Sequence, residues 1–256
     1  MSVFILSFLV ILWSFIHPPS SEIMVSENDE IWDIIIKDRY IEYKNEEHGR
    51  YKYPLGEEAL VISSLIGKRS KTEPDSLILI LGDHNASYGN RIEIYQIRDK
   101  TLKKTMERSF KEMNPWNIKL GDVNGDGINE IGVTMFKKTR FHPVLADRPF
   151  IYAWTTEAIV PLWRGSRLAH PFKTYTYYDI NKDGMDNLIA IEYLKNDQQI
   201  IHAYYWKGFG FESLVKSLPL EEIDDLVVKN KNLICFVNNK ELKVEFGENQ
   251  ELHLIE

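Results

Sequence analysis

The sequence contains a single cysteine among 256 residues, so no intrachain disulfide framework is possible. Zinc sites built from several cysteines and iron–sulfur clusters are excluded for the same reason. Positive charge is also scarce, because 31 Lys and Arg stand against 38 Asp and Glu, which gives a net charge of −7. Proteins that bind nucleic acids carry a basic surface that pairs with phosphates. The acidic balance therefore argues against a nucleic-acid partner.

Several catalytic motifs are missing as well. The chain has no G-x-S-x-G nucleophile motif, no glycine-rich phosphate loop and no H-E-x-x-H zinc motif. Its seven histidines do not follow metal-ligand spacing, and we expect His202 to be a packed residue within a strand. After Glu22 no segment shows sustained helical periodicity, whereas aromatic residues, which favour strands, are abundant. These features predict an all-β protein that is not an enzyme.

The first 21 residues differ from the rest of the chain. Val3 to Ile16 form an almost wholly apolar run of 14 residues, and two prolines and two serines follow it. This run is shorter than the roughly 20 residues that a membrane-spanning helix needs, but it matches the apolar core of a signal peptide. We expect residues 1–21 to be a signal peptide or a short anchor, and the protein to be secreted or held at the cell surface. Membrane contact is expected only through this segment.

Repeated segments indicate the architecture of the remaining chain. Trp116–Met135 resembles Lys173–Glu192, and the equivalent residues Asp122 and Asp179 lie 57 positions apart. A repeat of this length is typical of supersecondary units that stack on one another. Aromatic residues recur at equivalent places in these units, and we expect them to be core positions: Tyr95, Tyr152, Trp154, Tyr204 and Trp206.

Each unit reads as four short strands with turns between them, and four-stranded units at this period predict a β-propeller. A β-sandwich with chance similarity is the alternative. The expected blades lie near residues 57–110, 111–168, 169–220 and 221–256. Residues 22–56 are expected to add two or three strands, as an incomplete fifth blade.

The segment D-V-N-G-D-G-I-N-E carries the clearest binding motif. Its oxygen donors at loop positions 1, 3, 5, 7 and 9 are Asp122, Asn124, Asp126, the carbonyl of Ile128, and Glu130. Such alternation lets a short loop wrap a hard cation such as Ca²⁺, and Gly127 permits the sharp turn. An EF-hand is excluded, because position 12 is Val133 and a strand, not a helix, is expected to follow. A turn rich in Asp and Asn that binds no metal is the alternative.

This loop resembles the calcium loop of the integrin-type FG-GAP family, also called VCBS-like repeats. In that family a nine-residue acidic loop joins the first and second strands of a propeller blade and binds calcium. The matching positions of the next blade are Asp179, Asn181, Asp183, the carbonyl of Met185, and Asn187. Because Asn187 is not an acid, the resemblance implies one calcium in the first loop and weaker binding, or none, in the second.

The resemblance implies the fold but not the biological role, and our leading hypothesis is an exported, calcium-stabilised propeller that binds a protein or a glycan without catalysis of its own. A polysaccharide-acting enzyme on a propeller scaffold and a structural component of a cell envelope or spore surface are the alternatives. Long loops on a rigid scaffold tend to carry function, and here they are expected at the end opposite the calcium loops. These loops are Gly82–Asn90, Lys137–Arg148 and Leu194–Gln199, with the links Ser109–Pro115 and Ser166–Pro171. They gather a cationic and aromatic set suited to an acidic partner: His84, Tyr88, Arg140, His142, Arg167 and His170. Ordinary solvated loop residues are the alternative for this set.

Overall fold

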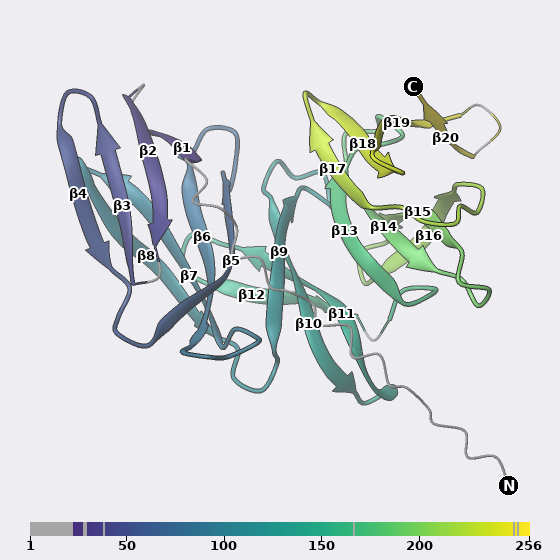
Figure 1. The fold of residues 1–256 in the computed structure, drawn as a ribbon, viewed down its shortest axis with the longest axis horizontal. Helices are drawn as coiled ribbons and strands as arrows, with labels where there is room; N and C mark the ends of the chain where they lie inside the picture. Colours follow the sequence, from purple (N-terminus) through teal and green to yellow (C-terminus); the bar gives the residue numbers. More distant parts are fainter. Residues whose placement is uncertain (1–22, 28–29, 38, 166, 248, 250) are drawn as a thin grey trace, which may run out of the picture.

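A computed structural model describes residues 23–27, 30–37, 39–165, 167–247, 249 and 251–256 (Figure 1). The predicted signal peptide or anchor, residues 1–21, lies outside this part of the chain. The described residues form strands and turns without any helix, so this part contains no helix that could cross a membrane. The predicted all-β class is confirmed.

In the described part of the chain, twenty strands form five antiparallel sheets of four strands each, and every sheet is built from consecutive strands. The first sheet contains β1 (Ile23–Glu27), β2 (Glu30–Lys37), β3 (Tyr40–Asn45) and β4 (Gly49–Pro54). The second contains β5 (Ala59–Gly67), β6 (Ser76–Asp83), β7 (Arg91–Arg98) and β8 (Thr101–Ser109). The third contains β9 (Pro115–Gly121), β10 (Glu130–Thr139), β11 (His142–Trp154) and β12 (Ile159–Arg164).

The two C-terminal sheets follow the same plan. The fourth sheet contains β13 (Phe172–Tyr178), β14 (Asn187–Tyr193), β15 (Gln199–Trp206) and β16 (Phe211–Lys216). The fifth contains β17 (Asp225–Lys229), β18 (Asn232–Val237), β19 (Lys240–Phe246) and β20 (Leu252–Ile255). The first strands of the second to fifth sheets are neighbours, because β9 contacts both β5 and β13, and β13 contacts β17. The first and fifth sheets lie at the two ends of this array (Figure 1).

Apolar clusters between successive sheets hold the array together. Strand β6 shows how one sheet serves two clusters, because side chains alternate between the faces of a strand. Leu77, Leu79 and Leu81 pack toward the first sheet, whereas Ile78 and Ile80 pack toward the third, and all five are at most 1% exposed. Burying each of these side chains contributes roughly 1.5–3 kcal/mol. The two-sided burial explains the uninterrupted apolar run of this strand.

The recurring tyrosines occupy the third strand of their sheets, as their equivalence in the repeats predicts. Tyr95, Tyr152 and Tyr204 are at most 4% exposed, and each belongs to the apolar cluster shared with the preceding sheet. Trp154 is buried in the same way, and Trp206 packs against the cluster from its edge. The prediction of core positions is confirmed for the three tyrosines and Trp154, whereas Trp206 is only partly buried.

Two segments are more regular than the sequence indicated. Residues 22–56 do not contain two or three strands, because Ile23–Pro54 forms a complete four-stranded sheet. Its fourth strand is largely exposed and polar, so it shows little of the alternation that marks a strand.

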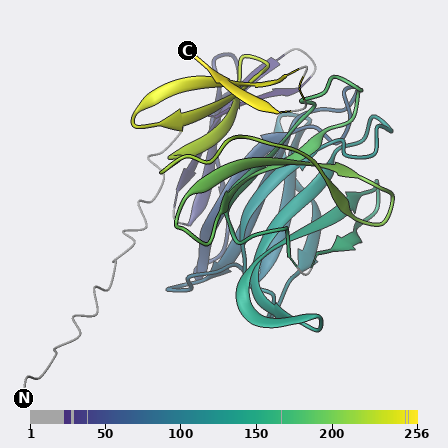
Figure 2. The ribbon, with the colours of Figure 1, turned by 90° about the vertical axis from the view of Figure 1, so that its right-hand side faces the viewer.

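The second correction concerns residues 137–148, which were expected to be a loop. They extend β10 and β11 into a long hairpin that projects from the molecule (Figure 2). Arg148 is 1% exposed and holds this hairpin together. Its guanidinium donates to the carbonyl oxygens of Lys137 at 3.1 Å and of Val144 at 2.6 Å. A buried arginine therefore orders a polar segment that lacks apolar periodicity.

Candidate calcium loops and central cavity

The first acidic loop joins β9 to β10 and is folded around the carboxylate of Asp122. One oxygen of this carboxylate accepts hydrogen bonds from the backbone N–H groups of Gly125 at 2.8 Å and Asp126 at 3.1 Å. The other accepts from Gly127 N–H at 2.8 Å. Gly125 and Gly127 have φ angles of 75° and 81°, a region that glycine enters without steric cost. The glycines thus let consecutive N–H groups converge on one carboxylate.

The second loop joins β13 to β14 and has the same internal structure. The carboxylate of Asp179 accepts from the N–H groups of Asp183 and Gly184, both at 3.0 Å. The carboxylate of Asp183 accepts from Met185 N–H at 2.9 Å, as that of Asp126 does from Ile128 N–H at 2.8 Å. The sequence repeat therefore corresponds to a structural repeat at the positions that were predicted to bind calcium.

The ninth position of each loop is buried and turns back onto the loop. Glu130 is 2% exposed and accepts from the N–H of Val123 at 3.1 Å. Asn187 is 1% exposed and makes the equivalent bond with the N–H of Ile180 at 3.1 Å. An amide oxygen therefore replaces a carboxylate oxygen without changing this backbone contact, while the negative charge is lost.

Contacts between loops join neighbouring sheets at this end of the array. The carboxylate of Asp186 accepts from Asp122 N–H at 2.9 Å, and Asp186 N–H donates to the carbonyl oxygen of Asp122 at 2.7 Å. On the other side, Asn129 N–H donates to the carbonyl oxygen of Arg69 at 2.7 Å, and the Asn129 amide donates to that of Lys68 at 2.8 Å. The first acidic loop is thereby held between the loops of the second and fourth sheets.

The loops provide oxygen donors that fit a hard divalent cation. Burial, followed by the charges of Asp126 and Asp122, raises the pKa of Glu130 from 4.5 to about 7. The pKa of Asp186 is raised by burial and then by Asp122 and Asp179. The side-chain oxygen of Asn181, at the third position of the second loop, is buried without a hydrogen-bond partner. A bound cation would favour the ionised form of these two carboxylates. It would also give the Asn181 oxygen a partner.

A cavity of about 520 Å³ opens beside these loops on the inner strands of the array. Its walls come from β5, β9, β13 and β17, and its polar lining includes Lys119, Asn129, Thr176 and Asp186. Burial lowers the pKa of Lys119, and the nearby Asp225 opposes that effect. Since Asp186 also contacts the first acidic loop, the cavity and the loops share residues.

The cationic and aromatic set lies on the loops and strand ends at the opposite end of the sheets. Arg140 lies in the exposed turn of the long hairpin, over the ring of Phe141 at 5.8 Å from its centroid. The pKa of His142 on β11 is lowered by partial burial and by the charges of Arg148 and Arg167, so these cations share one region. Tyr88 stacks on Phe136 with ring centroids 5.4 Å apart, whereas His84 is exposed and His170 half-buried. Of the predicted set, His142 and Arg167 therefore lie close enough to interact, and a ligand site at this end of the sheets stays a prediction.

A buried polar network in the fourth sheet was not predicted from the sequence. The Nδ1 atom of His202 lies 2.8 Å from a carboxylate oxygen of Glu192, and its Nε2 atom lies 2.7 Å from Ser213 Oγ. The hydroxyl of Tyr204 donates to the other oxygen of Glu192. Glu192 and His202 are fully buried, whereas Ser213 is exposed on β16. The prediction that His202 is a packed residue is confirmed.

No protein-family model matches the chain, and a search of curated proteins found no match.

Proposed function

We propose that the protein is a calcium-binding β-propeller that acts as an exported, non-catalytic binding module for a protein or a glycan. The observation that carries this proposal is the shared structure of the two acidic loops, whose donor oxygens are arranged by the same backbone contacts. Five consecutive four-stranded sheets with innermost first strands support the propeller (Figure 1). The cavity beside the loops supports a ligand site, because concave sites with few polar groups suit binding.

Calcium should stabilise the folded protein through the first loop. A ligand that binds only the native state at a hundredfold excess over Kd adds about 2.7 kcal/mol. For a chain of this size the melting temperature should rise by roughly 5–10 °C. Asp126→Asn keeps an acceptor for Ile128 N–H but removes one charge, so it should abolish most of the rise. Thermal melting with calcium and with chelator provides the measurement.

Two further variants make this test specific. Asp183→Asn changes the equivalent residue of the second loop and should have the smaller effect, because that loop lacks an acid at its ninth position. Asp83→Asn alters an exposed acid at the end of β6 and should leave the calcium response unchanged. A wild-type protein whose melting temperature does not respond to calcium would refute the proposed metal site.

The buried network favours one second candidate, an acyl-transfer enzyme. Glu192 can hold the imidazole of His202 so that its Nε2 accepts the Ser213 proton as the serine oxygen attacks an ester carbonyl. The proton would then pass to the leaving alkoxide, and water would hydrolyse the acyl-serine. This candidate ranks second, because Ser213 lies on the outer strand β16, whereas the cavity is formed by inner strands.

A fluorophosphonate probe tests this candidate directly, since it forms a covalent bond with activated serines only. Labelling that maps to Ser213 and disappears in both Ser213→Ala and His202→Gln would support an enzyme. Absence of labelling in the folded wild-type protein would assign the network a purely structural role.

A further inference from the structure

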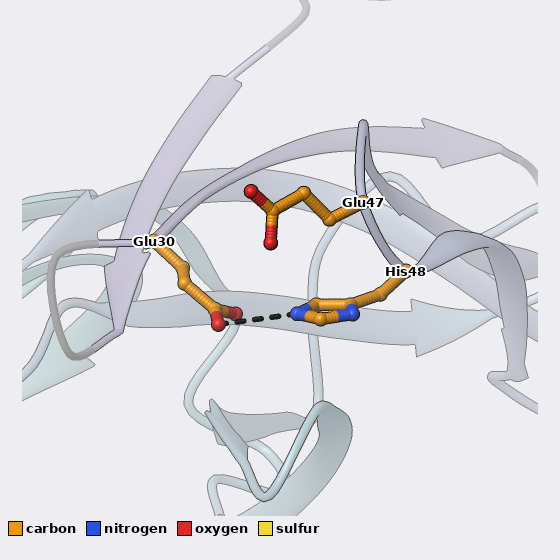
Figure 3. Close-up of side chains that lie close together, drawn as sticks. All are labelled: Glu30, Glu47 and His48. Atoms are coloured by element: carbon orange, nitrogen blue, oxygen red, sulfur yellow. Dashed lines mark hydrogen bonds and ion pairs between the residues drawn. The ribbon is translucent and has the colours of Figure 1, made fainter.

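We propose that Glu30, Glu47 and His48 form a binding site for a divalent transition-metal ion, with zinc as the best chemical fit. The three side chains meet at one end of the first sheet (Figure 3), whereas the acidic loops belong to the third and fourth sheets. Glu30 begins β2, and the other two lie in the turn between β3 and β4. One donor atom from each residue lies within 4.8 Å of the other two.

The spacing of the donors fits a small coordination sphere. His48 Nε2 and Glu30 Oε1 are 3.1 Å apart. Two donors about 2.0–2.1 Å from a tetrahedral zinc ion are separated by about 3.3 Å, so these two atoms need hardly move. Glu47 points toward the same space from above the imidazole and is exposed, so its side chain can rotate inward (Figure 3). Three protein ligands would leave a fourth position for water.

The surrounding residues hold the turn that carries two of the ligands. The side-chain oxygen of Asn45 accepts from the N–H groups of Glu47 at 2.9 Å and His48 at 3.3 Å. The Asn45 amide also donates to the carbonyl oxygen of Ile31 at 2.8 Å, which ties the turn to the residue next to Glu30. These bonds reduce the conformational freedom that the turn would lose when a metal binds.

The imidazole is oriented by an aromatic neighbour. His48 stacks on the fully buried Trp32 with ring centroids 5.8 Å apart and an interplanar angle of 28°. Its side chain is 17% exposed, and Nε2, the atom nearest Glu30, is turned toward the carboxylates. An imidazole nitrogen with two carboxylate oxygens favours zinc and its transition-metal neighbours over calcium, which prefers oxygen ligands throughout. The proposed site is therefore chemically distinct from the acidic loops.

Zinc titration by calorimetry tests the proposal on the folded protein in excess calcium, which occupies any calcium site. One zinc ion per chain is expected, and His48→Gln should weaken its binding by at least about tenfold. His84→Gln removes an exposed histidine elsewhere and should leave that affinity unchanged. Should His48→Gln fail to fold, the exposed Glu47→Gln change replaces it and should also weaken binding.

A second measurement reports the position of the metal. Nickel or copper bound to His48 should quench the fluorescence of the stacked Trp32, and this quenching should be lost in Trp32→Phe and in His48→Gln. The proposal is overturned if the wild-type protein binds no zinc, if the His48 and Glu47 variants bind it with wild-type affinity, or if excess calcium displaces it.

Discussion

Replacing His202 with alanine should destabilise the protein by about 3–5 kcal/mol, because it leaves the fully buried carboxylate of Glu192 without its imidazole partner. The hydroxyl of Tyr204 would remain as a donor to Glu192, and the space vacated by the imidazole would add a cavity cost. Such a loss is a large part of the free energy of unfolding of a typical domain, which is about 5–15 kcal/mol. Urea unfolding monitored by circular dichroism provides the measurement.

Two comparisons separate charge burial from simple loss of contacts. Ser213→Ala removes an exposed partner of the same imidazole and should cost no more than about 1 kcal/mol. The double change Glu192→Leu with His202→Leu should cost less than His202→Leu alone, because no charge remains buried without a partner. If the single leucine variant is the more stable of the two, the carboxylate is not the source of the cost.

Local features of the chain allowed much of the fold and of the acidic loops to be predicted. The conformation of the loop from Asp122 to Glu130 depends on alternating oxygen donors and on glycines at fixed positions. All of these residues lie within nine positions of the sequence. The turn chemistry of such loops is local, so a single sequence contains it. The recurring tyrosines were predictable for a related reason, since equivalent strands of stacked sheets present the same face to a neighbour.

Features that depend on distant contacts were missed. Glu192 and His202 meet because β14 and β15 pair in one register, and Ser213 joins them from the next strand. Glu30 and His48 lie 18 positions apart and meet across a turn held by Asn45. No spacing rule connects such residues, because the register of the strands places them together. The long hairpin of β10 and β11 was missed for the same reason, because it depends on contacts of the buried Arg148.

Without metal, the protein should lose stability as the pH rises from about 4.5 to about 8. Glu130 titrates near pH 4.5 in the unfolded chain, whereas burial and the charges of Asp126 and Asp122 raise its pKa to about 7 in the folded state. The folded state therefore binds more protons than the unfolded chain in this range. The contribution of Glu130 to the free energy of unfolding is complete below pH 4.5 and is lost as the pH rises through 7. This shift corresponds to roughly 3 kcal/mol as an upper estimate.

Glu130→Gln isolates this contribution, because glutamine keeps an oxygen to accept the Val123 N–H but does not ionise. In chelator, the free energy of unfolding of the variant should fall less between pH 5 and pH 8 than that of the wild type, by up to roughly 3 kcal/mol. Asp186 and Asp147 also have raised pKa values and should keep part of the slope in both proteins. Calcium should flatten the wild-type profile, because a bound cation favours the ionised carboxylate. If the free energy of unfolding of the two proteins depends on pH in the same way in chelator, Glu130 ionises normally. Its burial among the loop carboxylates then costs no free energy that calcium could offset.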